Sequence, residues 1–194
     1  MRISKSCLSL IASLLLGVTG SVRAADPMLV QFETSAGAFI VQLDPERAPL
    51  SVENFLRYVN EGFYAGTVFH RVVSGFVIQG GGFTRDLKLK QPHPGIPNES
   101  GNGLSNRRGT IAMARTGEPH SGDSQFYINL ADNPPLDPKP TRWGYAVFGE
   151  VIQGMEVIDD IGHRLTSVQG GMSDVPVEPV IIQKASFLKP PAAK

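Results

Sequence analysis

The sequence predicts a mainly β domain, with a closed and mostly antiparallel sheet of about eight strands and two α-helices. Short apolar segments recur along the chain, several of them alternating in polarity, and turn residues separate them. Helical periodicity occurs in only two stretches, which lie far apart in the sequence. Glycine (21 residues) and proline (15 residues) follow no period, which favours many turns over disorder. With 194 residues, the chain suits one sizeable domain.

The first residues have the pattern of a cleaved secretory signal peptide. Arg2 and Lys5 precede a short apolar stretch, and small residues follow up to Ala24. The apolar stretch is shorter than the roughly 20 residues that span a bilayer. We therefore expect residues 1–24 to be a signal peptide, cleaved after Ala24 or Ala25, with an uncleaved membrane anchor as the alternative.

Cleavage would leave a folded domain at residues 25–188 and a flexible tail at residues 189–194. The signal peptide holds three of the 18 basic residues and no acidic ones, so 15 basic and 18 acidic residues remain, a formal charge of −3. Cys7, the only cysteine, is lost with it, so no disulfide is needed. This balance of charge offers no basic stripe for nucleic acid. We expect a soluble periplasmic monomer without membrane association after cleavage.

The mature chain is predicted to begin with a hairpin and a helix. Met28–Glu33 and Gly37–Leu43 read as paired strands around a short turn. Pro49 then suits the first position of a helix, and Gly62 suits its C-terminal stop. Apolar residues between them recur at the spacing of one helix face, at Val52, Phe55, Leu56 and Val59.

Strands and a long loop are predicted next. Phe63–Tyr64 and Thr67–Gln79 read as strands, and the glycines at 80–82 indicate a bend or a close approach of backbones. Residues 86–108 are polar and interrupted by proline and glycine, so they are predicted to form a loop. A loop of this length in a compact domain is often functional.

The second half of the chain continues the β pattern. Further strands are predicted at Gly109–Arg115, Ser124–Leu130, Tyr145–Val151 and Val180–Phe187. A proline-rich loop is predicted at 132–141, and a short helix at about 154–161. About eight strands, with two helices far apart in the sequence, favour a mostly antiparallel closed sheet, and closure would remove exposed edges.

Arg71 is the unusual residue of the segment Val68–Gly82, because it lies among valine and phenylalanine residues in a predicted buried strand. An unpaired charge is costly there, so Arg71 has either a salt-bridge partner across the barrel or a functional task. Other chemistries lack support. The glycine run is not followed by the residues of a phosphate loop, and no metal spacing is found among the four histidines, His70, His93, His120 and His163. His70 is predicted to be a hydrogen-bonded structural residue.

Four blocks of the sequence, in order and at suitable distances, resemble the signature of the cyclophilins, a family of peptidyl-prolyl cis-trans isomerases. The blocks are Tyr64–Gly80, Met113–Arg115, Ser124–Ile128 and Tyr145–Gly149. The resemblance extends from about Met28 to Phe187 and is to the bacterial periplasmic branch. It implies a closed eight-stranded antiparallel β-barrel, filled with side chains and capped by two α-helices, with a groove on its outer face.

The resemblance also implies the function. Enzymes of this family catalyse rotation about Xaa-Pro peptide bonds and assist protein folding, here of exported proteins, without a cofactor or metal. Arg71 matches the catalytic arginine, and Gln79 and Gln125 match polar groups near the substrate backbone. Ala114 and Arg115 match the strand whose backbone pairs with the peptide. The implied partners are proline-containing segments of unfolded or exported proteins.

The remaining site residues match the walls of the family's proline pocket. Val77 replaces a methionine common in eukaryotic members, Tyr127 a phenylalanine, and Tyr145 a histidine. The matching residues are Phe76, Val77, Leu136, Tyr127 and Tyr145.

Pro135 is the clearest departure, because many members have a tryptophan or phenylalanine at that position. The tryptophan is associated with tight cyclosporin binding, and Trp143 is too distant in sequence to replace it. We therefore expect weak cyclosporin binding.

Two other functions remain open at this point. A cyclophilin fold could hold proline-containing segments without catalysis, as a chaperone or adaptor. A hollow β-barrel could instead carry a small molecule, although large apolar residues on every predicted strand favour a filled interior.

Overall fold

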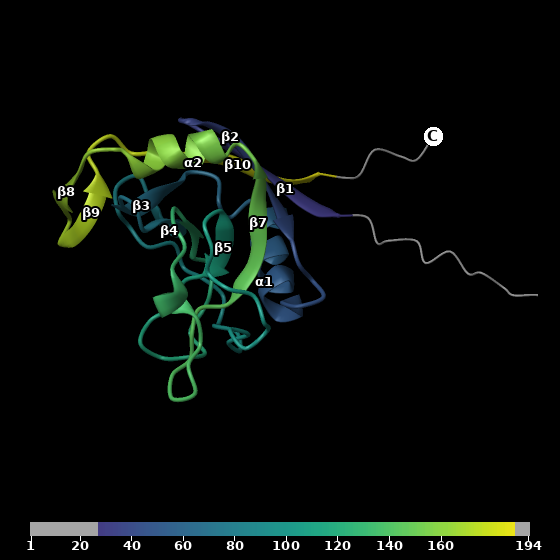
Figure 1. Cartoon of the computed structure of the whole chain (residues 1–194). Helices are drawn as coiled ribbons and strands as arrows, with labels where there is room; N and C mark the ends of the chain where they lie inside the picture. Colours follow the sequence, from purple (N-terminus) through teal and green to yellow (C-terminus); the bar gives the residue numbers. More distant parts are fainter. Residues whose placement is uncertain (1–26, 189–194) are drawn as a thin grey trace, which may run out of the picture.

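The computed structural model describes residues 27–188 (Figure 1). Within this range the chain forms ten strands, two α-helices and one short 3₁₀ helix. The strands are β1 (Met28–Thr34), β2 (Gly37–Leu43), β3 (Thr67–Val73), β4 (Val77–Thr84), β5 (Thr110–Met113), β6 (Phe126–Asn129), β7 (Val147–Gln153), β8 (Thr166–Gln169), β9 (Met172–Pro176) and β10 (Ile182–Leu188). The helices are α1 (Pro49–Asn60), α2 (Met155–Gly162) and the 3₁₀ turn η1 (Pro134–Leu136). No helix in the described range is long and apolar enough to cross a membrane.

Eight strands form one antiparallel sheet in the order β10-β1-β2-β7-β5-β6-β4-β3, and β8 and β9 form a separate hairpin. Helix α2 contacts β2 and β4, and α1 contacts β10. Figure 1 shows α2 across the top of the sheet and α1 lower down, beyond β7. The predicted signal peptide (1–24) and tail (189–194) lie outside the described residues.

The prediction of a closed barrel was wrong, because the sheet is an open half-barrel. Its end strands, β3 and β10, meet at a single isolated bridge, between Val68 and Ile181, and form no continuous ladder. Around the bridge, the N–H of Phe69 donates to the carbonyl of Val180 and the N–H of Gly66 to that of Ile182. The pairing extends no further along β10 because residues 61–66, which precede β3, form a turn in which Gly66 has a φ of 78°. The β8–β9 hairpin contacts β3 beside this opening (Figure 1).

Helix α1 begins at Pro49, as predicted, but the group that caps it comes from the long loop. Ala48, at the N-cap, offers no side-chain hydrogen bond. Instead, the Glu99 carboxylate accepts hydrogen bonds from the backbone N–H groups of Leu50 (3.0 Å) and Ser51 (2.7 Å). A carboxylate is favourable there, because helix N-termini carry free N–H donors and a partial positive charge. The loop at 86–108 is therefore tied to the helix.

Three element predictions need correction. The segment predicted as one strand at 67–79 is two strands, β3 and β4, joined by a turn in which Gly75 has a φ of 69°. Phe63 and Tyr64 lie in a turn rather than a strand. The β8–β9 hairpin was not predicted, because its residues are mostly exposed and polar and give little apolar alternation.

One face of the sheet is covered by an aromatic core. The rings of Phe32 and Phe39 stack with their centroids 4.7 Å apart, and Phe55 meets Phe126 edge-to-face at 5.9 Å. All four side chains are at most 1% exposed. Because these rings fill the concave side of the half-barrel, the structure argues against a small-molecule carrier with a hollow barrel.

The glycine run at 80–82 lies inside β4, where backbones approach closely, as predicted. Gly81 has a φ of 87°, in the left-handed region. A Cβ atom there would lie 2.9 Å from the rings of Tyr64 and Phe126 and from the carbonyl oxygen of Ser124. Only glycine both adopts this left-handed φ without strain and lacks the Cβ atom for which there is no room.

We predict that Gly81→Ala lowers the free energy of unfolding by about 2–4 kcal/mol, the combined cost of overpacking and a strained φ. Urea denaturation followed by circular dichroism measures the change. Gly101→Ala is the matched control, since nothing lies within 4 Å of its Cβ position, and it should leave stability nearly unchanged. Equal stability of the two variants would contradict the packing argument.

His70 is buried beside the strand that carries Arg71. Its ring lies tilted against Phe83 with centroids 4.6 Å apart, the residue is 5% exposed, and its buried Nδ1 has no hydrogen-bond partner within the described residues, so the predicted hydrogen bond is not seen at this nitrogen. The pKa of His70 is lowered to about 4, mainly by burial; the nearby Val68 backbone opposes this shift and the charge of Arg71 adds to it. The imidazole is therefore neutral near pH 7.

This burial predicts a pH-dependent stability. The unfolded chain binds a proton on His70 near pH 6.5 and the folded protein only near pH 4, so the free energy of unfolding should fall as pH drops between these values. We expect a slope of about 1 kcal/mol per pH unit. Urea titrations of His70→Gln at several pH values should show a shallower slope than those of the wild type. A wild-type slope retained in His70→Gln would contradict this assignment.

Candidate active site

Five residues on five neighbouring strands form one cross-strand row. Arg71 of β3 pairs with Gln79 of β4, which pairs with Tyr127 of β6. Tyr127 pairs in turn with Ala112 of β5, and Ala112 with Val147 of β7. Paired residues in a sheet point to the same face, so this row crosses one face of the sheet.

The row lies on the face opposite the aromatic core. The sequence neighbours Val72, Ile78, Phe126, Ile128 and Phe148 all belong to that core. Because side chains alternate along a strand, the residues of the row project to the other side. This is the face on which the family resemblance implies a groove.

One end of this outer face is apolar and contains all five residues predicted for the proline pocket. The cluster is separate from the main core. Its buried members are Val77, Ala112, Ala114, Tyr127 and Val147, and Phe76, Leu104, Leu136 and Tyr145 pack against them half-buried.

The other end of the outer face is a polar hollow of about 460 Å³. It contains the other five predicted residues, Arg71, Gln79, Ala114, Arg115 and Gln125. Ala114 belongs to both the hollow and the apolar cluster. The structure thus brings the ten predicted residues into one continuous surface.

Arg71 does have an acidic partner, but not a buried one across the barrel. Its Nε lies 3.9 Å from Oδ2 of Asp174, with side-chain exposures of 37% and 42%. An exposed pair at this distance contributes about 0–1 kcal/mol to stability. Within the described residues the guanidinium donates no hydrogen bond, and Arg71 lines the polar hollow.

The two glutamines contact each other at the floor of the hollow. The Gln79 side-chain amide donates to Oε1 of Gln125 at 3.2 Å. A Cβ atom on Gly82 would lie 2.5 Å from Cγ of Gln125, so the glycine run makes room for this side chain. Asp123 accepts a hydrogen bond from the backbone N–H of Gln125 and helps to orient it.

The Arg115 side chain binds the protein rather than projecting freely. Its guanidinium donates to the backbone carbonyls of Gly144 (3.1 Å), Trp143 (2.9 Å) and Thr116 (2.9 Å). It also lies over the ring of Tyr145, 4.5 Å from the centroid. Arg115 therefore holds Tyr145 in the wall of the apolar cluster.

Tyr127 carries a polar group behind the apolar cluster. Its hydroxyl donates to Oδ1 of Asn106 at 2.6 Å, and burial raises its pKa well above the ordinary value. Asn106 in turn donates to Asp137 at 2.8 Å from both its backbone and its side chain. Burial alone would raise the pKa of Asp137, but hydrogen bonds from Ser105 and Asn106 outweigh it and lower the pKa.

Sequence reasoning missed several residues of this surface. Asn106, in the long loop, accepts a hydrogen bond from the hydroxyl of Tyr127, and no local sequence pattern predicts that contact. Met172 and Ser173 line the hollow from the β8–β9 hairpin, and Asp174 reaches Arg71 from the same strand. The pair Gly170-Gly171 between two short segments was the available hairpin signal.

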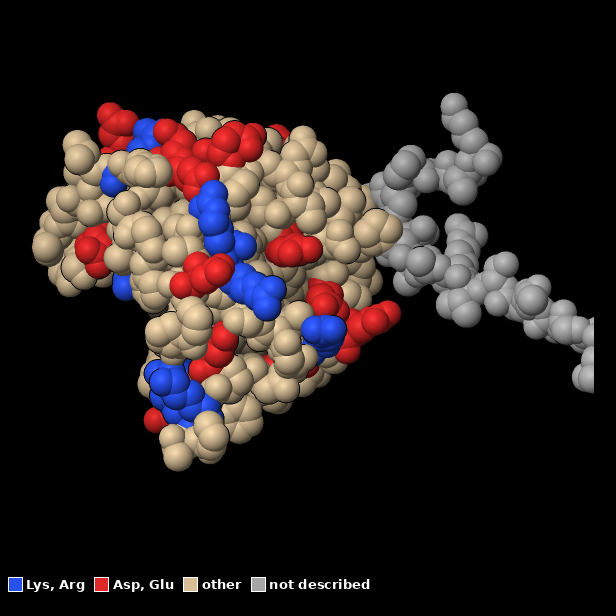
Figure 2. Space-filling model, in the orientation of Figure 1, with Lys and Arg blue, Asp and Glu red and all other residues tan. Residues whose placement is uncertain are grey.

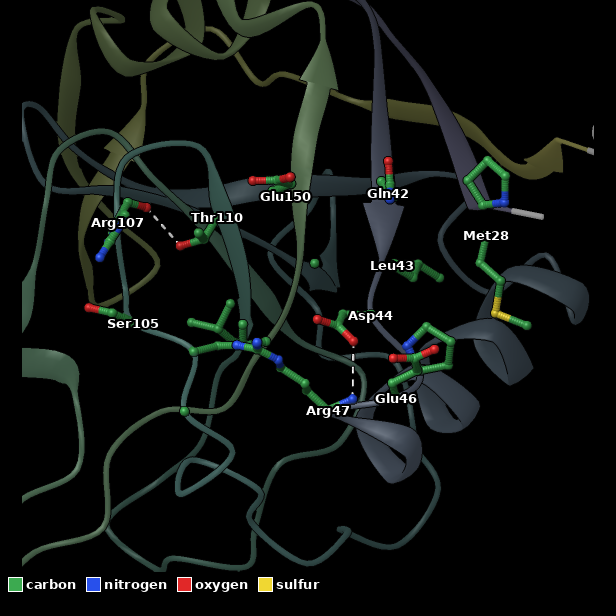
Figure 3. A pocket seen from close by; sticks show the side chains of 16 residues that line it. Met28, Gln42, Leu43, Asp44, Glu46, Arg47, Ser105, Arg107, Thr110 and Glu150 are labelled. Carbon is green, nitrogen blue, oxygen red and sulfur yellow. Dashed lines mark hydrogen bonds between the residues drawn. The ribbon is translucent and has the colours of Figure 1, made fainter. Parts of the chain in front are cut away.

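A larger hollow, of about 560 Å³, adjoins the apolar cluster at Leu104 and Val147 but contains none of the ten predicted site residues. Figure 3 shows its lining, where the acidic Asp44, Glu46 and Glu150 alternate with Arg47 and Arg107. On the face drawn in Figure 2, basic side chains are likewise flanked by acidic ones. Residues 27–188 contain no group of three side chains suited to hold a metal ion. The candidate site is therefore the outer-face row.

Comparison with known proteins shows the family to which the chain belongs. The family model described as "Cyclophilin type peptidyl-prolyl cis-trans isomerase/CLD" matches residues 29–187. Peptidyl-prolyl cis-trans isomerase A of Dickeya dadantii (strain 3937) is 52% identical over 160 residues, covering 82% of this chain and 84% of the relative. Peptidyl-prolyl cis-trans isomerase B of Escherichia coli (strain K12) is 47% identical over 161 residues, covering 81% and 98%.

Solved structures show the same fold. A cyclophilin type isomerase of Cryptosporidium parvum aligns with a TM-score of 0.71 and 26% identity, covering 86% of this chain and all of that one. A crystal structure of the same protein in the presence of the dipeptide Ala-Pro aligns with a TM-score of 0.70, covering 84% and 99%. With a family match over nearly the whole described range and relatives near half identity, the chain belongs to the cyclophilin-type peptidyl-prolyl cis-trans isomerases.

Proposed function

We propose that this isomerase acts on Xaa-Pro bonds of exported proteins, with Arg71 as the group that stabilises the twisted transition state. The observation that carries the proposal is the cross-strand row, which holds a charged donor beside an apolar cluster on a single rigid sheet face. The periplasmic location rests on the signal-peptide pattern of residues 1–24.

Rotation about an Xaa-Pro bond requires no proton transfer and no nucleophile. The uncatalysed reaction takes tens to hundreds of seconds, because twisting the amide breaks its resonance, with a barrier of about 20 kcal/mol. In the twisted state the proline nitrogen becomes pyramidal and its lone pair becomes available. A donor directed at that nitrogen binds the twisted form better than either planar form and so lowers the barrier. The neutral, buried His70 is consistent with a site that does no acid–base work.

Arg71 has the properties that such a donor needs. Its guanidinium is permanently charged and planar, and it is held on a strand in register with Gln79. Among the described residues only Asp174 pairs with it, and loosely, which leaves donors for a substrate. One preorganised donor of this kind contributes about 3–4 kcal/mol, or roughly a 10²–10³-fold rate effect.

The apolar cluster is suited to hold the proline ring while the preceding residue rotates. Phe76, Leu136 and Tyr145 form half-buried walls, and the buried Val77 and Tyr127 form the base. An apolar ring is driven into such a cluster by loss of hydrated surface. This arrangement fixes the proline side of the Xaa-Pro bond, so that the preceding residue is the part that rotates.

A bound peptide also needs free backbone N–H and C=O groups of the protein with which its own backbone can form hydrogen bonds. In the described residues, no hydrogen bond uses the backbone N–H or C=O of Arg115, whereas the N–H of Ala114 donates to Gln125. Arg115 lies beside the hollow and just beyond the end of β5. We propose that its backbone groups pair with the substrate and that Gln79 and Gln125 contact the substrate backbone near the bond that rotates.

Replacing Arg71 tests the mechanism. We expect Arg71→Ala to lower the rate of cis-trans exchange of an Ala-Pro-Phe peptide by roughly 10²–10³-fold, measured by NMR line shapes or exchange spectroscopy. Arg47→Ala is the control, because Arg47 lies in the other hollow (Figure 3), and it should retain the wild-type rate. A folded Arg71→Ala protein with full activity would refute the role of Arg71. Binding without exchange in the wild type would instead favour a non-catalytic module.

Cyclosporin binding is expected to be weak. Pro135 lies in the 3₁₀ turn η1, where the family often has an aromatic side chain, and the half-exposed Trp143 packs edge-to-face on His120 rather than on the apolar cluster. The ligand therefore lacks one large aromatic contact. We predict a dissociation constant on the order of micromolar or weaker by titration calorimetry. Pro135→Trp should tighten binding, and submicromolar affinity of the wild type would overturn the prediction.

A further inference from the structure

The β8–β9 hairpin forms one wall of the polar hollow. Gly171, Met172 and Ser173 line the hollow together with Arg71, and β9 contacts β3 (Figure 1). This hairpin is not part of the main sheet, and it was absent from the predicted elements. It brings Asp174, more than a hundred residues away in sequence, to the side of Arg71.

Asp174 is held in an unusual backbone conformation. Its φ is 60°, and Leu87 (φ 56°) is the only other non-glycine residue in the described range with a positive φ. Aspartate and asparagine tolerate this region better than most residues. Asp174 is followed by the buried residues Val175 and Pro176, which anchor the strand at this point. The conformation thus fixes where the carboxylate lies.

The contact with Asp174 involves only one of the three guanidinium nitrogens of Arg71. Nε is the nitrogen of the guanidinium that lies 3.9 Å from Oδ2 of Asp174. A partner at Nε leaves both terminal Nη groups free to donate. An arginine side chain has several rotatable bonds, so without a partner its head would sample many positions. A loose, charged contact can bias these positions without occupying the donors.

We propose that Asp174 is a positioning residue, which orients the guanidinium of Arg71 over the hollow for the isomerisation step. The proposal rests on the catalytic role proposed above for Arg71. It gives the hairpin a function in the reaction, because the hairpin supplies the carboxylate. A nearby anion also weakens the field of a cation, and by this effect alone the reaction would be slowed less once the anion is removed. The two effects differ in sign, and the experiment separates them.

Asp174→Asn removes the charge but keeps the preference for a positive φ, and Asp174→Gly keeps the backbone freedom without the side chain. We expect both to lower kcat about three- to fivefold, the equivalent of an exposed ion pair, with KM nearly unchanged. Peptide exchange measured by NMR at several peptide concentrations gives both constants. An unchanged or increased kcat would overturn the proposal.

The matched control is Glu33→Gln. Glu33 pairs with Lys184 at 3.8 Å, and both side chains are exposed, but they lie on β1 and β10 away from the hollow. This variant should retain the wild-type kcat. Because salt screens exposed charges, wild-type kcat should also fall towards that of Asp174→Asn as salt rises to about 1 M, whereas Asp174→Asn should respond weakly. Parallel salt responses would count against the proposal.

A double-mutant cycle distinguishes positioning from a direct substrate contact. In an Arg71→Ala background, Asp174→Asn should have no further effect on the residual rate, because there is no guanidinium left to orient. A three- to fivefold loss that persists in that background would overturn the proposal. If Arg71→Ala alone is fully active, the catalytic role of Arg71 fails as well. If Arg71→Ala is impaired but Asp174→Asn is not, only the positioning role fails.

Discussion

The alternation of side chains across one antiparallel sheet is the constraint on which the rest of this structure depends. Each strand sends alternate residues to a stacked aromatic core, and so it must send the others to the outer face. Register then matters more than sequence distance: Arg71, Gln79 and Tyr127 come from three strands and meet in one row. A shift of one residue in the pairing register of any of these strands would point its site residue towards the core instead of the outer face. The packing that stabilises the fold therefore also holds the site in place.

This coupling suits the chemistry. Isomerisation needs a fixed donor and a fixed ring but no group that changes its protonation, so a stiff sheet face is an appropriate scaffold. The titratable groups around the site agree with this interpretation. Burial lowers the pKa of His70 and raises that of Tyr127, so both side chains are neutral near pH 7. The guanidinium of Arg115 donates its hydrogen bonds to backbone carbonyls. Arg71 differs from these in keeping its donors unbound within the described residues, with a loose ionic contact at Nε.

The segments outside the sheet act as supports rather than as coverings. Glu99 in the long loop caps helix α1, and Asn106 near the end of the same loop binds the hydroxyl of Tyr127 and the carboxylate of Asp137. This loop thus connects the helix to the base of the apolar cluster. The β8–β9 hairpin supports the other end of the surface by contributing part of the hollow's wall and Asp174. Both segments lack regular apolar patterning, which is why their roles do not follow from periodicity.

The sequence by itself determined the strands and helices with strong local patterns, and through the family resemblance it identified the ten residues that the structure brings onto one surface. The elements could be predicted because period-two and helical patterns are local in the sequence. Arg71 could be singled out because it is a charged residue among the apolar residues of a predicted strand. Only the tertiary structure decided that the sheet is open, since the single bridge near the ends of β3 and β10 joins Val68 to Ile181, more than a hundred residues later in the chain. The partners Asn106 and Asp174 were likewise decided by the fold, because contacts between distant segments depend on register and loop path and leave no local trace in the chain.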